Sequence, residues 1–520
     1  MFCPNCGTKL EEGLNFCPEC GRRILTEEVA SSAEETGGFT EPPAGDSKNL
    51  FSRRNVKGMI GIVAAVAVVI LIVKFMAAVF VAEKPDSVAA VYDSENNESV
   101  IYVNGKNAGT VDGEAELYSD MDGEADFIYA DGTVYYIKGK KLIEVMDDCR
   151  SIIVAAHAGA ALLMDEDNAL QRYTCSDRKL TELTDENVYT CAISGDGKYF
   201  AYTTYDDDGD KVSYIGRKAG SETKVKGVVV YVISEDGKYM YGLEYDEDDY
   251  SENLVLINRK GETEIIAKDI DEIVGFNEDG TEIMFLQDGK TYVSVKGKDK
   301  QKVSSHEITT VLCGKSSPDN MDGFFPVKSF QGAVVQISDD GEVEISILSS
   351  RYEAETIVKD VTYVTYMDIT EDASKIFYQE GDELYYVKAK KNAKAKKLAD
   401  DVGRVVGISR DGKHIYYNNE DDELCYIKGT GKSSAVKDPE ECYYGYMCDD
   451  SLYVYSSEDE EYYYVKGKKA RKLDNISMVR YDVSADVVYG ADEDTFYEID
   501  GSRIKKLKGD FDEISDVIFR

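Results

Sequence analysis

The sequence predicts an all-β fold of repeated hairpins, preceded by a metal-binding head and one apolar helix. Three observations lead to this prediction. An Asp-Gly turn between apolar runs recurs with a period near forty residues, four cysteines lie in the first twenty residues, and an apolar run covers 58–82. No helical period interrupts the repeats. We therefore expect four segments: a head at 1–24, a linker at 25–57, a membrane helix at 58–82 and a repeated body at 83–520.

The head contains two Cys-x-x-Cys pairs, each followed by glycine: Cys3 with Cys6 and Cys17 with Cys20. Four thiolates at this spacing suit tetrahedral Zn²⁺, and they leave no position for a catalytic water. So short a segment cannot bury a core, so a structural zinc ion must supply its folding free energy, about 10 kcal/mol. These pairs resemble the short zinc ribbons that open many bacterial membrane proteins, which implies a docking module whose partner is unknown.

Two other roles for the head fit less well. Nucleic-acid binding needs a basic face, but three acidic residues offset the three basic ones, Lys9, Arg22 and Arg23. A redox pair usually opens a long helix, and neither cysteine pair does so.

The linker is rich in Glu, Ser, Gly and Pro, which is typical of a flexible segment. The next 25 residues would form a helix of roughly 37 Å, enough to cross a bilayer core of about 30 Å. Its one charge, Lys74, lies near the far end, where the side chain can reach the interface. Because Arg53, Arg54 and Lys57 precede the span, we expect a cytoplasmic head and an extracytoplasmic body. A cleaved signal peptide is less favoured, because the run begins after residue 50 and lacks a good cleavage site.

The body repeats one hairpin. Ile193-Ser-Gly-Asp-Gly-Lys-Tyr recurs as Ile233-Ser-Glu-Asp-Gly-Lys-Tyr and Ile408-Ser-Arg-Asp-Gly-Lys-His, with weaker copies at Phe276 and Ile369. A second hairpin follows in each unit, so forty residues make a four-stranded blade of a β-propeller. The Ser-x-Asp-Gly-Lys hairpin resembles the TolB-type propeller repeat. This resemblance implies a binding face at the mouth of the propeller and no particular reaction, although the proline usual before the aspartate is missing.

The number of units exceeds that of an ordinary propeller. About eleven fit between 88 and 520, whereas single propellers usually stop at eight blades. We therefore favour two propellers in tandem, divided near 307–322, over one large ring.

The formal net charge is −40, and the body holds nearly all of it, with 52 Lys and Arg against 91 Asp and Glu. We expect this acid mainly to keep the surface soluble, and we expect it to repel nucleic acid and anionic phospholipid. Binding of cations or basic ligands is the other interpretation. The seven cysteines of the body are odd in number and widely spaced, so they do not suggest a disulfide framework. Only Cys442 and Cys448 are close enough in sequence for a bridge to be considered.

No catalytic constellation is evident in the sequence. The three histidines, His157, His306 and His414, are scattered, and no Gly-x-Ser-x-Gly elbow occurs. The acidic runs 206–210 and 246–249 offer oxygen ligands for Ca²⁺, but neither fits a calcium-binding loop, so calcium is a weak expectation.

The 38 tyrosines should mostly pack between strands, while those at blade tops could form a rim that binds sugar or peptide. We expect a non-enzymatic, membrane-anchored sensor or scaffold that binds an external ligand or protein. The alternative is an extracytoplasmic glycan hydrolase or lyase that uses two converging carboxylates.

Overall fold

The structure is a computed structural model that describes residues 87–121, 123, 125–246, 251–312, 324–325, 328–339, 342–482 and 485–519. The chain divides into two compact units, Met1–Ala82 and Glu83–Arg520, and every described residue belongs to the second. The four predicted zinc ligands, the linker and the apolar run 58–82 therefore lie outside the described residues. Within the described part, no helix is long and apolar enough to cross a bilayer.

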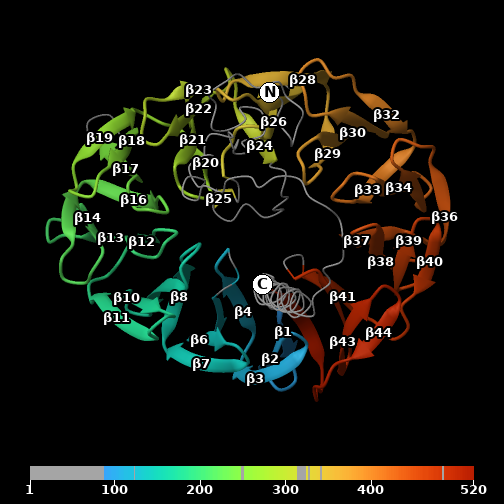
Figure 1. The fold of residues 1–520 in the computed structure, drawn as a ribbon, viewed down its shortest axis with the longest axis horizontal. Coiled ribbons are helices and arrows are strands. Elements are labelled where there is room, and N and C mark those ends of the chain that lie inside the picture. Colours follow the sequence, from blue (N-terminus) through green and yellow to red (C-terminus); the bar gives the residue numbers. More distant parts are fainter. Residues whose placement is uncertain are drawn as a thin grey trace, which may run out of the picture. The chain divides into compact units, whose positions relative to one another are not determined.

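The described residues form an all-β, propeller-like ring of eleven four-stranded blades, which we number in ring order (Figure 1). Blades 1 to 4 contain β45 (Ile514–Phe519), β1 (Val88–Asp93), β2 (Glu98–Val103) and β3 (Lys106–Asp112); β4 (Ala115–Ser119), β5 (Asp126–Ala130), β6 (Thr133–Lys138) and β7 (Lys141–Met146); β8 (Cys149–Val154), β9 (Ala160–Asp165), β10 (Leu170–Thr174) and β11 (Lys179–Thr184); and β12 (Thr190–Ile193), β13 (Phe200–Tyr205), β14 (Lys211–Gly216) and β15 (Thr223–Lys226).

Blades 5 to 8 contain β16 (Val228–Ile233), β17 (Met240–Asp246), β18 (Ser251–Ile257) and β19 (Thr263–Ala267); β20 (Glu272–Asn277), β21 (Glu282–Gln287), β22 (Lys290–Val295) and β23 (Gln301–Lys302), with β25 (Phe324–Phe325) added beside β20; β24 (Ile308–Leu312), β26 (Val334–Asp339), β27 (Glu342–Leu348) and β28 (Ala354–Val361); and β29 (Val364–Ile369), β30 (Lys375–Glu380), β31 (Glu383–Lys388) and β32 (Lys396–Ala399).

Blades 9 to 11 contain β33 (Val402–Ile408), β34 (His414–Asn419), β35 (Glu423–Lys428) and β36 (Ser434–Glu440); β37 (Cys442–Cys448), β38 (Ser451–Ser456), β39 (Glu461–Lys466) and β40 (Lys469–Lys472); and β41 (Met478–Asp482), β42 (Val487–Asp492), β43 (Thr495–Asp500) and β44 (Arg503–Lys506). The first of the four main strands of each blade lies nearest the centre of the ring, with β25 inside β20 in blade 6, and the four main strands of every blade pair antiparallel (Figure 1).

The repeated motif forms the turn between the first and second strands. In blade 4, Ser194 Oγ accepts the Tyr199 amide at 2.9 Å and donates to Asp196 Oδ1 at 2.8 Å. Ser409 repeats both bonds with His414 and Asp411 at 2.9 and 2.8 Å. Gly412 has a φ of 65°, and a Cβ there would lie 2.8 Å from Phe377 and Thr370. The motif is thus explained by turn geometry, which requires glycine at this position.

The ring is closed by its two ends. β1 pairs antiparallel with β45, with Ala89 opposite Phe519 and Val91 opposite Val517. Eleven clusters of buried side chains fill the ring, and each lies between two successive blades, including blades 11 and 1. Among the described residues, every blade is therefore packed on both sides.

The expectation of two tandem propellers is wrong, because 83–520 is one contact unit and its last strand pairs with its first. The proposed division near 307–322 covers β24, the first strand of blade 7, and part of the segment that follows it. The alternative of one large ring agrees with the structure.

Antiparallel strands place the turns of each blade at two faces of the ring. We call the first face the acidic face. It holds the turn between the second and third strands and the connection to the next blade. We call the opposite face the lysine face. It holds the inner turn, between the first and second strands, and the outer turn, between the third and fourth.

Candidate functional site

The acidic face holds most of the negative charge of the body. The described turns between second and third strands contain 18 Asp and Glu and no Lys or Arg. The described connections between blades add 15 Asp and Glu against only Lys268 and Lys508. The charge recorded in the composition is thus concentrated on one side of the ring, where it favours a cationic ligand.

Exposed tyrosines lie on this same side. Among the described residues, the exposed large aromatic side chains are Tyr189, Tyr205, Tyr231, Tyr245, Tyr363 and Tyr443. Five of them lie in blade connections or at the ends of strands that meet the acidic face, and Tyr231 lies on the inner strand β16. Four of the six belong to blades 4 and 5, and we call these the tyrosine patch: Tyr189, Tyr205, Tyr231 and Tyr245.

The tyrosine patch combines open aromatic rings with carboxylates. Tyr189, 51% exposed, and Tyr205, 50% exposed, meet edge to face with ring centroids 5.6 Å apart. Lys211 Nζ lies 5.2 Å from the centre of the Tyr189 ring. The Lys211 ammonium therefore shows that the face of the Tyr189 ring can bind a cation. Such a cation–π contact contributes about 0.5–1 kcal/mol at an exposed site.

A β-bulge positions the third member of the patch. The pairing of β16 with β17 shifts between Val230 and Val232, which leaves Tyr231 unpaired on the inner strand and 44% exposed. A bulge of this kind redirects a side chain. Burial, followed by Glu252 and Tyr189, raises the pKa of Tyr231 further above neutrality. Its hydroxyl is protonated at neutral pH, as in any tyrosine, and can donate a hydrogen bond. Glu252 lies opposite Tyr245 in the β17 and β18 pairing.

The acidic turn of blade 4 borders the patch and makes its own hydrogen bonds. Asp206 Oδ1 accepts the amides of Asp208 and Asp210 at 3.2 and 3.0 Å, and Lys226 Nζ lies 3.5 Å from Oδ2. Within the described residues, no group of three or more His, Cys, Asp or Glu side chains is arranged to hold a metal ion. The weak expectation of calcium at 206–210 therefore gains no support. Residues 247–249 of the second acidic run lie outside the described part of the chain.

The other side chains singled out from the sequence are spread around the ring. His157 Nε2 lies 3.7 Å from Glu278 Oε1, and His414 Nδ1 lies 2.9 Å from the Tyr426 hydroxyl. Cys442 and Cys448 begin and end the same strand, β37, so about 20 Å of extended backbone separates them. Both thiols are free, which excludes the bridge considered from their spacing.

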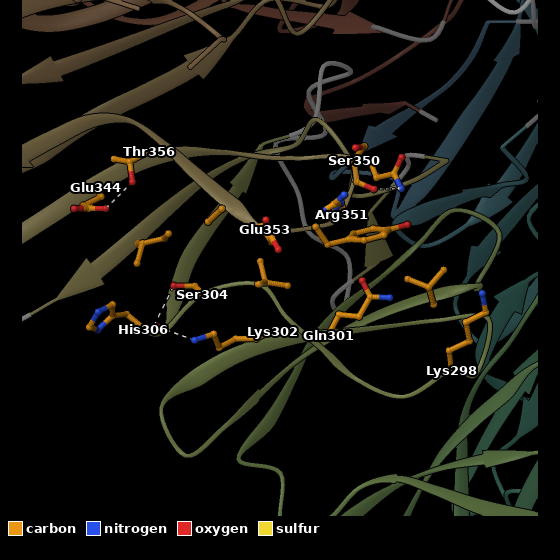
Figure 2. Close-up of a pocket in the computed structure, with 17 residues that line it drawn as sticks. Lys298, Gln301, Lys302, Ser304, His306, Glu344, Ser350, Arg351, Glu353 and Thr356 are labelled. Atoms are coloured by element: carbon orange, nitrogen blue, oxygen red, sulfur yellow. Dashed lines mark hydrogen bonds between the residues drawn. The ribbon is translucent and has the colours of Figure 1, made fainter. Parts of the chain in front are cut away.

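A cavity of 920 Å³ opens between blades 6 and 7 and contains His306 (Figure 2). Lys302, Ser304 and His306 come from β23 and the connection that follows it, whereas Glu344 and Thr356 lie across from them on β27 and β28. Thr356 donates to Glu344 at 3.0 Å, and Lys359 Nζ lies 3.5 Å from the same carboxylate. The lining thus mixes both charges, and Glu344 is held in local polar contacts.

A second cavity, of 640 Å³, lies along the inner turns of blades 8 to 10 and holds several carboxylates. Burial alone would raise the pKa of Asp411, but hydrogen bonds from Lys413 and Ser409 lower it to about 2. Hydrogen bonds from Thr370 and Ser374 likewise lower the pKa of Asp372 to about 2. A general acid in a glycosidase needs the opposite shift, so these two carboxyls are unsuited to that role.

Asp411→Asn should lower stability at neutral pH but not in strong acid. The folded pKa of Asp411 is depressed, so its contribution is complete above about pH 4 and disappears as the pH falls toward 2. After a discount for solvent screening of this half-exposed ion pair, we expect a loss of about 1 kcal/mol at pH 7. Urea unfolding from pH 7 to pH 2 measures the difference. Asp207→Asn, in an exposed acidic turn, is the matched control; an equal loss there would remove the special role of Asp411.

The patch was only partly visible in the sequence. The sequence predicts a tyrosine rim at blade tops, and Tyr205 and Tyr245 lie forty residues apart, each before an acidic run. Tyr231 carries no such signal, because its exposure depends on the bulge. Two further exposed tyrosines, Tyr363 and Tyr443, lie in other blades.

Among the parts of the chain, comparison with known proteins assigns only the N-terminal head to a domain family. Residues 2–24 match the zinc-ribbon domain family, so the chain begins with a zinc-ribbon domain ahead of a propeller-like all-β ring. No curated protein matches the chain. The likeness of the repeats to the TolB type stays a prediction.

Two solved structures share weak likeness with the chain. A crystal structure of the eukaryotic initiation factor matches with 10% identity and a TM-score of 0.42, covering 67% of this chain and 95% of that one. Dihydro-heme d1 dehydrogenase NirN in complex with DHE matches with 13% identity and a TM-score of 0.31, covering 74% of each chain. Both TM-scores are below 0.5, so neither structure assigns a function to this protein.

Proposed function

We propose that this protein is a single-pass membrane protein whose extracytoplasmic ring binds a cationic segment of a partner protein. The acidic face and its tyrosine patch form the binding surface. The zinc-ribbon domain lies in the cytoplasm, where Cys3, Cys6, Cys17 and Cys20 hold a structural zinc ion and the ribbon docks a second, unknown partner. The apolar run 58–82 joins the two parts across the membrane.

One observation carries the binding proposal: the exposed tyrosines and the concentrated carboxylates share one side of the ring. Tyrosine supplies large contact area at low entropic cost, and carboxylates supply long-range attraction for basic groups. An acidic surface without aromatic groups needs no role beyond solubility. Open tyrosines beside acidic turns instead suit a partner that carries lysine or arginine.

We propose a binding role in preference to catalysis. A retaining or inverting glycosidase needs two carboxyls about 5–10 Å apart, one of them with a raised pKa. Burial raises the pKa of Asp368, but this side chain accepts hydrogen bonds from the Tyr366 hydroxyl at 3.0 Å and the Ile369 amide at 2.7 Å. No observation here favours the hydrolase or lyase alternative.

Replacing two rings of the patch should weaken binding of a cationic peptide. We expect Tyr189→Ala with Tyr205→Ala to raise the Kd of a fluorescent decalysine peptide about tenfold, because two cation–π contacts and their buried area are lost. Fluorescence anisotropy at fixed ionic strength measures the affinity.

The control is Tyr363→Ala, which removes a still more exposed tyrosine, 67% exposed, from the connection between blades 7 and 8. It should leave the Kd within a factor of two. If all variants bind like the unmodified protein, acid alone attracts the peptide and the patch is not the site.

A further inference from the structure

The lysine face carries a basic rim that the net charge conceals. The eleven outer turns contain 15 Lys and Arg against 5 Asp and Glu. The basic members, which we call the lysine rim, are Lys140, Arg178, Arg217, Lys218, Arg259, Lys260, Lys296, Lys298, Lys300, Arg351, Lys390, Lys391, Lys394, Lys432 and Lys468.

The inner turns of the same face do not cancel this rim. Their described residues include 12 Asp and Glu against 5 Lys and Arg, and they lie nearer the centre of the ring. Part of their charge is paired within the turn: Lys198 Nζ lies 2.9 Å from Asp196, and Lys413 Nζ lies 2.7 Å from Asp411. The outer circumference of this face is therefore positive, and its interior is acidic, with seven more acidic than basic side chains among the described residues.

The acidic face is too far away to neutralise the rim. A six-residue strand spans about 20 Å between the two faces. The Debye length is about 8 Å at physiological ionic strength, so a charge on the rim is screened from the carboxylates opposite. We expected the body to repel anionic phospholipid because we treated its negative charge as spread evenly over the surface. The acidic and basic turns lie on opposite faces, so that expectation does not apply to the lysine face.

The chain enters the ring at the lysine face. Ser87 accepts the Asn104 amide through its carbonyl at 2.8 Å, and its own amide donates to Asn104 Oδ1 at 3.0 Å. Asn104 belongs to the outer turn of blade 1. The apolar run ends at Ala82, five residues before Ser87, and five residues reach at most about 18 Å. If 58–82 crosses a bilayer, at most about 18 Å of extended chain therefore separates the end of that span from Ser87.

We propose that the lysine rim docks the ring on anionic phospholipid headgroups of the membrane that holds the chain. This inference rests on the proposed function for the membrane anchor. The rim extends over the outer turns of blades 2 to 10 on one face, so many of its members can meet a plane together, whereas a rod-shaped polyanion would reach only a few. Each lysine or arginine near an anionic surface strengthens binding about fivefold.

The test measures vesicle binding by fragment 83–520, which has no apolar run to insert. The fragment contains all eleven blades and all eleven buried interfaces, closed by β45 on β1, and a circular dichroism spectrum checks its fold. In 0.1 M salt, it should sediment with vesicles of phosphatidylcholine containing 30% phosphatidylglycerol and remain in solution with phosphatidylcholine alone. In 1 M salt, binding should disappear.

Two variants with the same change in charge separate the faces. Lys390→Glu with Lys394→Glu reverses two exposed lysines of the rim and should weaken vesicle binding at least tenfold. Lys268→Glu with Lys508→Glu reverses the two lysines of the blade connections on the acidic face and should change it less than twofold. Equal effects of both pairs, equal binding to both kinds of vesicle, or binding only to short duplex DNA would overturn the proposal.

The anchor is examined separately in the full chain. Protease added to intact cells should digest the region after Pro85, and alkaline washing should leave the chain in the membrane. If the fragment binds anionic vesicles but the full chain washes off, the anchor fails and the docking surface stands. If the full chain stays in the membrane but the fragment ignores anionic vesicles, the anchor stands and the docking surface fails.

Discussion

Val517→Asp should open the ring and lower its stability by more than about 4 kcal/mol. Val517 is 2% exposed on β45, opposite Val91 of β1, and it packs with Tyr489 and Phe496 of blade 11. Burying an unpaired carboxylate there costs several kcal/mol, in addition to the lost apolar contact. Without β45, β1 becomes an exposed edge and blade 11 loses its neighbour, so unfolding should begin at this seam.

Thermal unfolding and hydrogen exchange measure the effect. Exchange should accelerate first at the amides of β1 and β41 to β44. Ser515→Asp is the matched control, because Ser515 lies in the bulge of the same strand and its side chain is exposed. A Val517→Asp protein as stable as Ser515→Asp would show that the pairing of β45 with β1 does not hold the ring closed.

Cys17→Ser should abolish zinc binding by the ribbon. The zinc-ribbon domain at residues 2–24 has four cysteines, and tetrahedral zinc binding uses all four thiolates. Loss of one thiolate should raise the Kd for zinc by several orders of magnitude and leave the ribbon unfolded, because the metal supplies its folding free energy of about 10 kcal/mol. The ring should melt unchanged.

Elemental analysis of the purified full chain measures the metal. We expect one zinc ion per chain for the unmodified protein and for Cys448→Ser, which alters a free thiol of β37, and none for Cys17→Ser. Full zinc content in the Cys17→Ser protein would exclude a four-thiolate site.

The local structure of the body could be predicted from the sequence because its causes are local. An Asp-Gly pair between alternating apolar residues specifies a hairpin, and Ser409 and Asp411 show how side chains of the motif complete the turn. Repetition of two hairpins then predicts a four-stranded blade, and the count of about eleven units matches the eleven blades.

The closure of the ring could not be predicted in the same way. It depends on Ala89 meeting Phe519, residues more than four hundred positions apart, and on the angle between neighbouring blades. That angle is set by the volumes of side chains in the interfaces, such as Tyr102 against Phe496 at 5.0 Å between ring centroids. No short sequence pattern encodes that angle. The usual maximum of about eight blades per propeller therefore led to the wrong prediction of two propellers.

The distribution of charge shows the same limit. Net charge is a sum over the chain, but the sorting of Asp206 and Lys390 to opposite faces follows from strand order alone. Because successive strands of a blade run in opposite directions, the turns between second and third strands always lie at the acidic face and the outer turns always lie at the lysine face. The exposure of Tyr231 requires one further fact, the bulge in β16, which leaves no mark in the composition.

The entry of the chain at β1 also determines how the ring bears load. A pull from the N-terminal segment enters at Ser87 and acts along the axis of β1, which is hydrogen-bonded to β2 on one side and to β45 on the other. These hydrogen bonds run perpendicular to the strands, so such a force shears them together and does not break them one by one. The N-terminal segment is thus attached where a pull loads two strand pairings in shear, and one of these is the seam that closes the ring.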